Sequence, residues 1–167
     1  MKLLFKYVLF CSLSVLAGCM PKDEKIDESS FAQSMTFGRF ITPGCFDSEL
    51  CVEIFNINTE GLREDINDNF PETSGFYNGN FATPLSQSDY TQVELIFRNN
   101  IPEELLQRNS GNVGAFPTWN ANYYYFEYKS AGIHKFWIID GSFDGNLGIV
   151  LQNFIQKIQD AVVIASS

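Results

Sequence analysis

NYYYFEYKSAGIHKFWIID, residues 122–140, is the stretch of sequence that decides the fold. Two runs of aromatic and β-branched residues flank the turn signal Ser130-Ala131-Gly132, and this pattern predicts a β-hairpin. Both runs carry aromatic side chains at successive positions, so we expect a central hairpin with helices on one face and partial cover on the other. The 16 Phe, 7 Tyr and 2 Trp of the chain also favour a β-containing domain with a large core.

Earlier segments supply the other strands that we expect. Residues 36–41 and 50–57 alternate apolar with other side chains, and Pro43-Gly44 breaks the chain between them. A weaker strand is expected over residues 62–68. Residues 69–84 contain several Gly and Pro residues and are interpreted as a loop, whose aromatic side chains are expected to pack inward: Phe70, Phe76, Tyr77 and Phe81.

Residues 85–99 are ambiguous between a strand and a helix. Part of the segment alternates like a strand, but an apolar face repeats at helical spacing from Tyr90 to Phe97. Either Ser86 or Ser88 would cap the start of a helix. We therefore favour the helix.

Two more helices are expected. Residues 101–108 suit a short helix, because Pro102 falls in its first turn and two glutamates lie near its positive end. Residues 147–164 suit an amphipathic helix lying across a sheet, with a buried stripe that comprises Leu147, Val150, Leu151, Phe154, Ile158, Ala161 and Val162. The expected fold class is therefore α+β: an antiparallel β-sheet with a C-terminal amphipathic helix and one or two further helices packed on it.

Residues 1–18 are interpreted as a signal peptide, because two lysines accompany an apolar run too short for a stable membrane span. Leu16-Ala17-Gly18-Cys19 resembles the lipobox of bacterial lipoproteins, in which the cysteine is acylated and begins the mature chain. The alternative is an ordinary secretory signal with an incidental cysteine. We expect lipidation at Cys19, a lipidated flexible tether over residues 19–34 and a single globular α+β domain over residues 35–167.

The charge of the chain argues against a nucleic-acid partner. Removal of residues 1–18 takes away two lysines and no acidic residue, so the formal net charge changes from −9 to −11. The remaining chain has no cluster of Lys or Arg, which a polyanion-binding surface requires. An acidic balance is more typical of solubility than of a cationic partner.

Cys45 and Cys51 are the cysteines that remain once Cys11 leaves with the signal peptide and Cys19 carries lipid. An exported and oxidising compartment favours a disulfide between them, worth about 2 kcal/mol for so short a loop. Free thiols are the alternative. A metal site is disfavoured because two thiols and the distant His134 fall short of a complete ligand set. We expect no metal and no other cofactor.

Two features of the tether bear on location. Met20 stands where an aspartate would resemble the inner-membrane retention signal of Gram-negative lipoproteins, so the outer membrane is favoured. Lys22-Asp23-Glu24 resembles the signal that sends lipoproteins of Bacteroidota to the cell surface, and a solvated charged linker without a signal is the alternative. We expect a lipid-anchored outer-membrane protein, with exposure at the cell surface favoured.

The stretch Asp140-Gly-Ser-Phe-Asp-Gly145 imitates the start of a calcium loop, because oxygen-bearing side chains alternate and glycine stands sixth. The twelfth position holds Leu151 rather than a glutamate, and a strand precedes the loop. A strand-to-helix turn capped by Asp144 or Asn146 explains the same residues. We favour the turn, and ion binding by the Asp140–Asp144 loop stays open.

His134 is the only histidine, and no hydrolase, metalloprotease or phosphate-binding motif accompanies it. We therefore assign no catalytic residue. Aromatic side chains in and near the hairpin suit either a platform for a glycan or protein or a packed layer beneath other elements, and we favour packing for Tyr123, Tyr124, Tyr125, Tyr128, Trp119 and Trp137.

Several short motifs together resemble a group of uncharacterised small lipoproteins of Bacteroidota. They include Cys51-Val-Glu-Ile-Phe55, Ile101-Pro-x-x-Leu-Leu106 and the hairpin ending Trp137-x-Ile-Asp140, and the resemblance covers most of residues 36–164. Residues 114–122 lack aspartates that members of this group often carry. The resemblance implies one α+β domain on a lipid tether and supplies no activity.

Two functions are consistent with these patterns. The favoured one is a non-enzymatic binding or envelope-associated module, attached to the membrane by its N-terminal lipid, with a protein or glycan as its partner. The alternative is an envelope hydrolase that uses scattered carboxylates and His134. The first is favoured because nothing in the sequence assembles a nucleophile, a base and an oxyanion donor.

Overall fold

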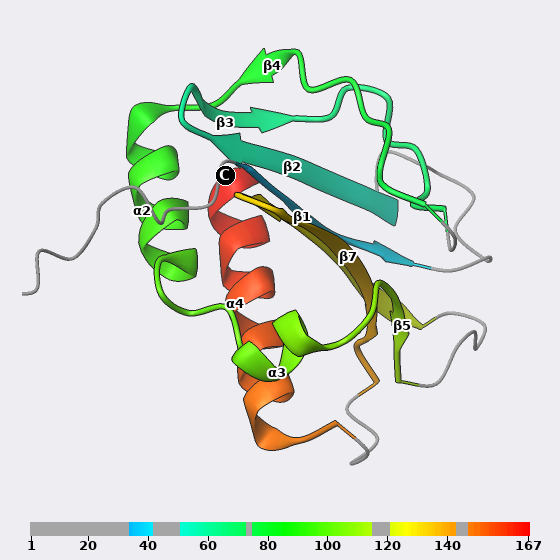
Figure 1. Ribbon diagram of the computed structural model, residues 1–167. Helices are drawn as coiled ribbons and strands as arrows, with labels where there is room; N and C mark the ends of the chain where they lie inside the picture. Colours follow the sequence, from blue (N-terminus) through cyan, green and yellow to red (C-terminus); the bar gives the residue numbers. More distant parts are fainter. Residues whose placement is uncertain (1–33, 42–50, 73–74, 115–120, 143–146) are drawn as a thin grey trace, which may run out of the picture. The chain divides into compact units, whose positions relative to one another are not determined.

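β6 (Asn122–Ser130) and β7 (Ile133–Asp140) form the antiparallel hairpin predicted from the sequence. Gly132 occupies the turn with φ +78°, a left-handed conformation that glycine adopts without steric cost. In the computed structural model (Figure 1), the described residues are 34–41, 51–72, 75–114, 121–142 and 147–167, all within the unit Phe31–Ser167. The predicted signal peptide, Cys19 and nearly all of the tether lie outside these residues.

A single β-sheet organises the described part of the chain. Besides the hairpin it contains β1 (Ser34–Ile41), β2 (Val52–Asn58), β3 (Gly61–Glu64), β4 (Thr83–Pro84) and β5 (Gly111–Val113). The strand order is β4-β3-β2-β1-β6-β7-β5, and neighbours are antiparallel except for the parallel pair β5 and β7. This sheet and the helices packed on it make the α+β fold that the sequence predicts.

The four main strand predictions are confirmed, with ends that shift by at most two residues. The predicted strand 62–68 is wrong in its second half, because β3 ends at Glu64. Strands β4 and β5 are not predicted from the sequence. Strands of two or three residues are too short to show a period-two pattern, so only the sheet next to them reveals them.

Helices α2 (Gln87–Phe97), α3 (Glu103–Gln107) and α4 (Ile149–Ala165) pack on one face of the sheet, and α2 and α4 lie side by side (Figure 1). Ser86 caps α2 by accepting a hydrogen bond from the backbone N of Asp89 at 3.2 Å, which confirms the helical interpretation. The expectation that Asp144 or Asn146 caps the last helix is wrong, because α4 begins after Gly148.

An aromatic row crosses the middle of the sheet beneath the helices. Phe97 of α2 lies against Phe37 with ring centroids 5.0 Å apart, and Phe154 of α4 meets Phe126 edge-on at 4.9 Å. These ring contacts dock both helices on the same strands. The row consists of four fully buried rings that the register aligns on neighbouring strands: Phe55, Phe37, Phe126 and Trp137.

The segment of residues 65–82, described except for 73 and 74, covers much of the opposite face of the sheet. Tyr77 and Phe81 pack against its buried side chains, as predicted. Phe70 and Phe76 are 47% and 44% exposed, so the prediction that they pack inward is wrong. Each still meets one ring of the sheet edge-on, Phe70 with Phe40 and Phe76 with Phe136.

The apolar stripe of α4 is buried as predicted, with one exception. Phe154 and Ile158 are almost fully buried, and Ile155 joins them. Val150 was expected in the stripe but is 49% exposed, because it lies in the first turn of α4 and borders a groove described below. Among the described residues, no helix has the length and apolar character needed to cross a membrane.

Replacing Phe154 with alanine should destabilise the domain by about 3–5 kcal/mol, because the substitution leaves a cavity under α4 and removes the edge-on contact with Phe126. Chemical denaturation followed by far-UV circular dichroism measures this loss. Val163→Ala is the matched control on the same helix, since Val163 is 61% exposed and its truncation should change stability by no more than about 0.5 kcal/mol. Equal stability of the two variants would contradict the packing of α4 described here.

Candidate functional site

The residues predicted to be modified lie partly within the described chain. Cys51 is 2% exposed and is disulfide-bonded. Cys45, its predicted partner, lies outside the described residues, as does Cys19. The Cys45–Cys51 pairing and the lipidation of Cys19 therefore stay predictions.

The aromatic side chains of the hairpin form two packed layers rather than an exposed platform. Those of Tyr123, Tyr125 and Trp137 are fully buried, and Tyr124 is 5% exposed. Tyr128 is half-buried against the helix side of the core. The packing interpretation is confirmed for these residues, whereas Trp119 lies outside the described chain.

Tyr77 fastens the covering segment to the sheet. Its backbone N donates hydrogen bonds to the Tyr125 hydroxyl at 2.9 Å and to Glu127 Oε2 at 3.3 Å. Its own hydroxyl donates to Asp65 and to the carbonyl oxygen of Asn69, 3.0 Å away. One tyrosine thus joins the end of β3 to β6, although Tyr77 and Tyr125 are 48 positions apart in sequence.

Asp65 holds the two ends of this segment together. Its carboxylate is 1% exposed and accepts hydrogen bonds at Oδ1 from the backbone N of Asn80 (2.6 Å) and of Asn67 (3.3 Å). Oδ2 accepts the Tyr77 hydroxyl. A buried carboxylate is costly unless such donors surround it, and here both oxygens are occupied. Asp65 is therefore a structural residue.

His134, the residue considered for hydrolysis, is engaged in the same network. Its Nε2 lies 2.8 Å from Glu127 Oε1, while Glu127 Oε2 accepts a hydrogen bond from the Tyr125 hydroxyl at 2.7 Å. Phe76 stacks on the imidazole with ring centroids 3.7 Å apart. Among the described residues, no hydroxyl or thiol is hydrogen-bonded to His134, so the nucleophile and base of a covalent hydrolase are not brought together.

The electrostatics of this network also oppose nucleophilic chemistry. Burial raises the pKa of the Tyr77 phenol, and the hydrogen bond to Asp65 and the charge of that carboxylate raise it further. Burial, followed by the charge and hydrogen bond of Glu127, raises the pKa of Tyr125 in the same way. Both phenols stay neutral at physiological pH and act as hydrogen-bond donors rather than as nucleophiles.

The acidic turn after β7 begins with a buried side chain. Asp140 is 4% exposed, and its Oδ1 accepts a hydrogen bond from the backbone N of Ser142 at 2.9 Å. This local bond is typical of a turn. Residues 143–146, and with them the rest of the calcium-like motif, lie outside the described chain. Within the part that the structure describes, no group of three His, Cys, Asp or Glu side chains could hold a metal ion.

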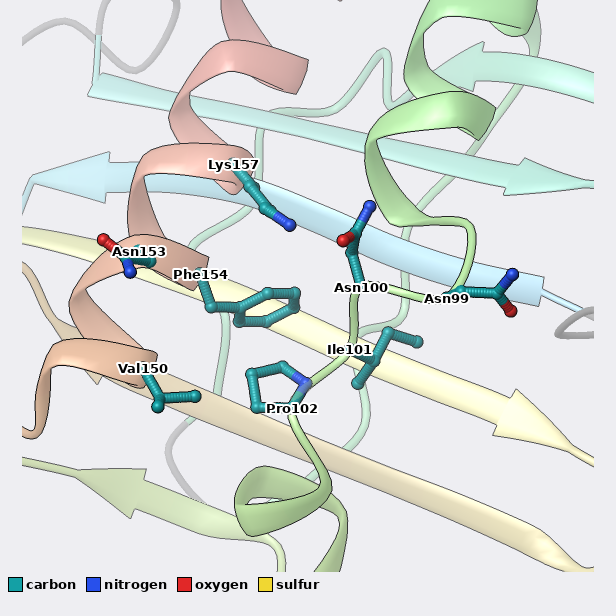
Figure 2. A pocket seen from close by; sticks show the side chains of 8 residues that line it. All are labelled: Asn99, Asn100, Ile101, Pro102, Val150, Asn153, Phe154 and Lys157. Carbon is teal, nitrogen blue, oxygen red and sulfur yellow. The ribbon is translucent and has the colours of Figure 1, made fainter.

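A groove lies between the first turns of α4 and the connection from α2 to α3 (Figure 2). Its volume is about 320 Å³, within the usual range of small-molecule sites, about 300–1,000 Å³. The side chains of Lys157 and Asn100 extend toward the space between α4 and the α2–α3 connection (Figure 2). The Phe154 ring lies in the same space, on the α4 side. The lining residues are Asn99, Asn100, Ile101, Pro102, Val150, Asn153, Phe154 and Lys157.

The end of α2 builds one wall of this groove. Asn99 adopts a left-handed conformation with φ +58°, which ends the helix and redirects the chain. The next residue is held in place because the Asn100 side chain donates to the carbonyl oxygen of Ile96 at 2.9 Å. Pro102, the N-cap residue of α3, continues this wall toward that helix. Residues 99–102 thereby line the side of the groove across from α4, and the Asn99 side chain points away from α4 (Figure 2).

No local pattern in the sequence indicates the groove. The predicted helix over residues 85–99 ends at Asn99 and the next one begins after Asn100, so the sequence assigns neither asparagine a role in a site. A usable signal was present in Asn99-Asn100, because asparagine tolerates the left-handed conformation better than most residues and can present its amide at a helix end. The contact with α4, about fifty positions later, could not be foreseen from that signal.

The stability of the domain should fall as the pH rises above 10, the ordinary pKa of tyrosine. The unfolded chain then releases phenol protons that Tyr77 and Tyr125 retain in the folded state, so each phenol lowers the free energy of unfolding by up to about 1.4 kcal/mol per pH unit. Urea denaturation between pH 9 and pH 11 measures the slope. The double variant Tyr77→Phe, Tyr125→Phe should show a shallower slope than the wild type, and identical slopes would rule out the raised pKa values.

The fold therefore brings together two sets of polar groups with different properties. In the set around Tyr77, Asp65 is buried, Tyr77 and Glu127 are half-buried, and the carboxylate oxygens are occupied by donors from the covering segment and the sheet. In the groove, Asn100 donates to Ile96, whereas the side chains of Asn99, Asn153 and Lys157 form no hydrogen bond or ion pair within the part of the chain that the structure describes. Comparison with family models, with curated proteins and with solved structures gives no match to this chain.

Proposed function

We propose that this chain is a lipid-anchored outer-membrane or cell-surface protein whose domain acts as a non-enzymatic binding module. The observation that carries the binding assignment is the contrast between the two sets of polar groups. His134, Glu127 and Asp65 are used to hold the covering segment on the sheet. The groove beside α4 leaves polar groups open to a ligand.

The anchor is supported by the N-terminal sequence. Leu16-Ala17-Gly18-Cys19 follows a short apolar run, and the acidic tether begins directly after it. Acyl chains contribute about 0.8 kcal/mol for each buried methylene, so several of them hold a protein at a membrane stably. Met20 and Lys22-Asp23-Glu24 support the outer membrane and exposure at the cell surface. The resemblance to small lipoproteins of Bacteroidota agrees with this arrangement.

An envelope hydrolase based on carboxylates and His134 is the second candidate. Asp65 and Glu127 do converge on Tyr77, which is the kind of arrangement that an enzyme would need. Their oxygens already accept hydrogen bonds from the protein, and His134 is stacked under Phe76. A hydrolase would have to break this network to reach its substrate, so the binding module is the better supported proposal.

The mature protein should begin at an acylated Cys19 and fractionate with the outer membrane. Expression of the full chain in a Gram-negative host, followed by mass spectrometry of the N-terminal peptide, tests this. Cys19→Ala should accumulate as an unprocessed precursor, because the acyl acceptor is missing. Cys11→Ala, in the segment to be removed, is the matched control and should be processed normally. A wild-type protein that starts at another residue without acyl mass would exclude the anchor.

The purified full chain in detergent should retain an envelope component from a cell extract without converting it. Mass spectrometry of the extract before and after incubation detects any hydrolysed ester, peptide or glycan. His134→Gln should retain the same component as the wild type, because the groove does not contain His134. A product that forms with the wild type and not with His134→Gln would favour the hydrolase instead.

A further inference from the structure

The chain enters its sheet at an end that carries exposed apolar and basic side chains. We infer that this end, called the entry end below, rests on the phospholipid surface of the membrane that holds the anchor. The entry end comprises the start of β1, the turn between β6 and β7 and the Phe76 ring beside that turn. This inference rests on the lipid anchor of the proposed function, and it adds the orientation of the domain.

The register of the strands places these groups together. Ser34, the first residue of β1, lies across from Lys129 of β6, and Lys129 lies across from His134 of β7. Phe76 of the covering segment stacks on the His134 ring, with the centroids 3.7 Å apart. The stretch of chain that leads from Cys19 therefore joins the domain beside a lysine, a histidine and an exposed phenylalanine.

Large apolar side chains are exposed at the entry end. Phe76 is 44% exposed, although His134 covers one face of its ring and Phe136 meets its edge. Ile133 is 39% exposed where β7 begins. A pair of such side chains is too small for a stable protein–protein interface, which buries about 800 Å² on each partner. Insertion of apolar side chains between lipid headgroups needs no partner of matching shape.

The charges at the entry end are complementary to anionic headgroups. Lys129 is exposed and, within the described chain, forms no hydrogen bond or ion pair. The neighbouring acidic side chains already have partners, since Glu127 contacts His134 and Glu60 pairs with Arg63. The chain as a whole has a formal net charge of −9, which opposes contact between its acidic surfaces and an anionic membrane. Charge thus favours the entry end as the contact.

The length of the connection to the anchor makes a weak contact sufficient. Residues 19–33 span at most about 50 Å when fully extended, so an anchored domain stays close to the bilayer. The contact is then intramolecular, and a short linker gives an effective concentration in the millimolar range. A pair of apolar side chains that could not retain a separate protein can therefore hold the domain against its own membrane.

Tryptophan fluorescence in vesicles tests this orientation. The acylated full chain with Phe76→Trp is reconstituted in vesicles of phosphatidylglycerol and phosphatidylcholine with brominated acyl chains, which quench a tryptophan that reaches the bilayer. The introduced tryptophan, measured as the difference from the wild type, should lose about half of its emission, because a contact of millimolar affinity is about half populated at this effective concentration. Vesicles without bromine give the unquenched reference.

Phe70→Trp is the matched control. Phe70 lies on the same covering segment and is 47% exposed, but it contacts Phe40 near the far end of β1. Six residues of strand, about 20 Å, separate Phe40 from Ser34. The tryptophan at position 70 should therefore keep its emission. Equal quenching of the two variants, or no quenching of either, would overturn the inference.

Reversal of the charge at position 129 tests the electrostatic part. Lys129→Glu, added to Phe76→Trp, should restore most of the lost emission in vesicles that contain phosphatidylglycerol, because it places a carboxylate against anionic headgroups. In vesicles of phosphatidylcholine alone, the same substitution should have a much smaller effect. Unchanged quenching in the anionic vesicles would contradict the contact proposed here. Thermal melting checks that each variant is folded.

Mass spectrometry of the same preparations separates this inference from the proposed function. If Cys19 carries acyl chains and Phe76→Trp is not quenched, the orientation is wrong and the anchor stands. If Cys19 carries no acyl chain, the anchor is excluded and this orientation with it.

Discussion

The buried aromatic row Phe55–Phe37–Phe126–Trp137 is the interaction on which the rest of the structure depends. Its rings lie on neighbouring strands, and the two long helices are held on it by Phe97 and Phe154. The register also requires a small residue at the centre of the sheet, since a Cβ on Gly38 would collide with the Glu53 carbonyl. Any shift of register by one residue would turn these rings to the other face and leave both helices without a surface to pack on.

The second face of the sheet explains why the polar side chains around Tyr77 are engaged in hydrogen bonds. That face is apolar at one end, and a segment with little regular structure covers it. Such a segment buries backbone groups that need partners, and Asp65, Tyr77 and Glu127 provide them. These charged and titratable residues therefore have a structural role. The groove that borders α4 lies on the helix side of the sheet.

The groove itself is a consequence of how α2 ends. Asn99 turns the chain in a left-handed conformation and directs residues 100–102 along the flank of α4, whose packing on the aromatic row sets its position. The lining residues come from two segments about fifty positions apart, and only the shared core brings them together. Residues that stabilise the fold, such as Phe154, thus also line the groove.

The sequence by itself determined the hairpin, the main strands, the α2 segment and the long C-terminal helix, because periods of two and 3.6 residues are local properties that adjacent residues record. It also determined the α+β class, which follows from those elements. Only the tertiary structure decided the short strands β4 and β5, the exposure of Phe70 and Phe76, the partner of His134 and the groove around Lys157. Each of these depends on contacts between residues far apart in the chain, and such contacts leave no periodic signal in the residues that make them.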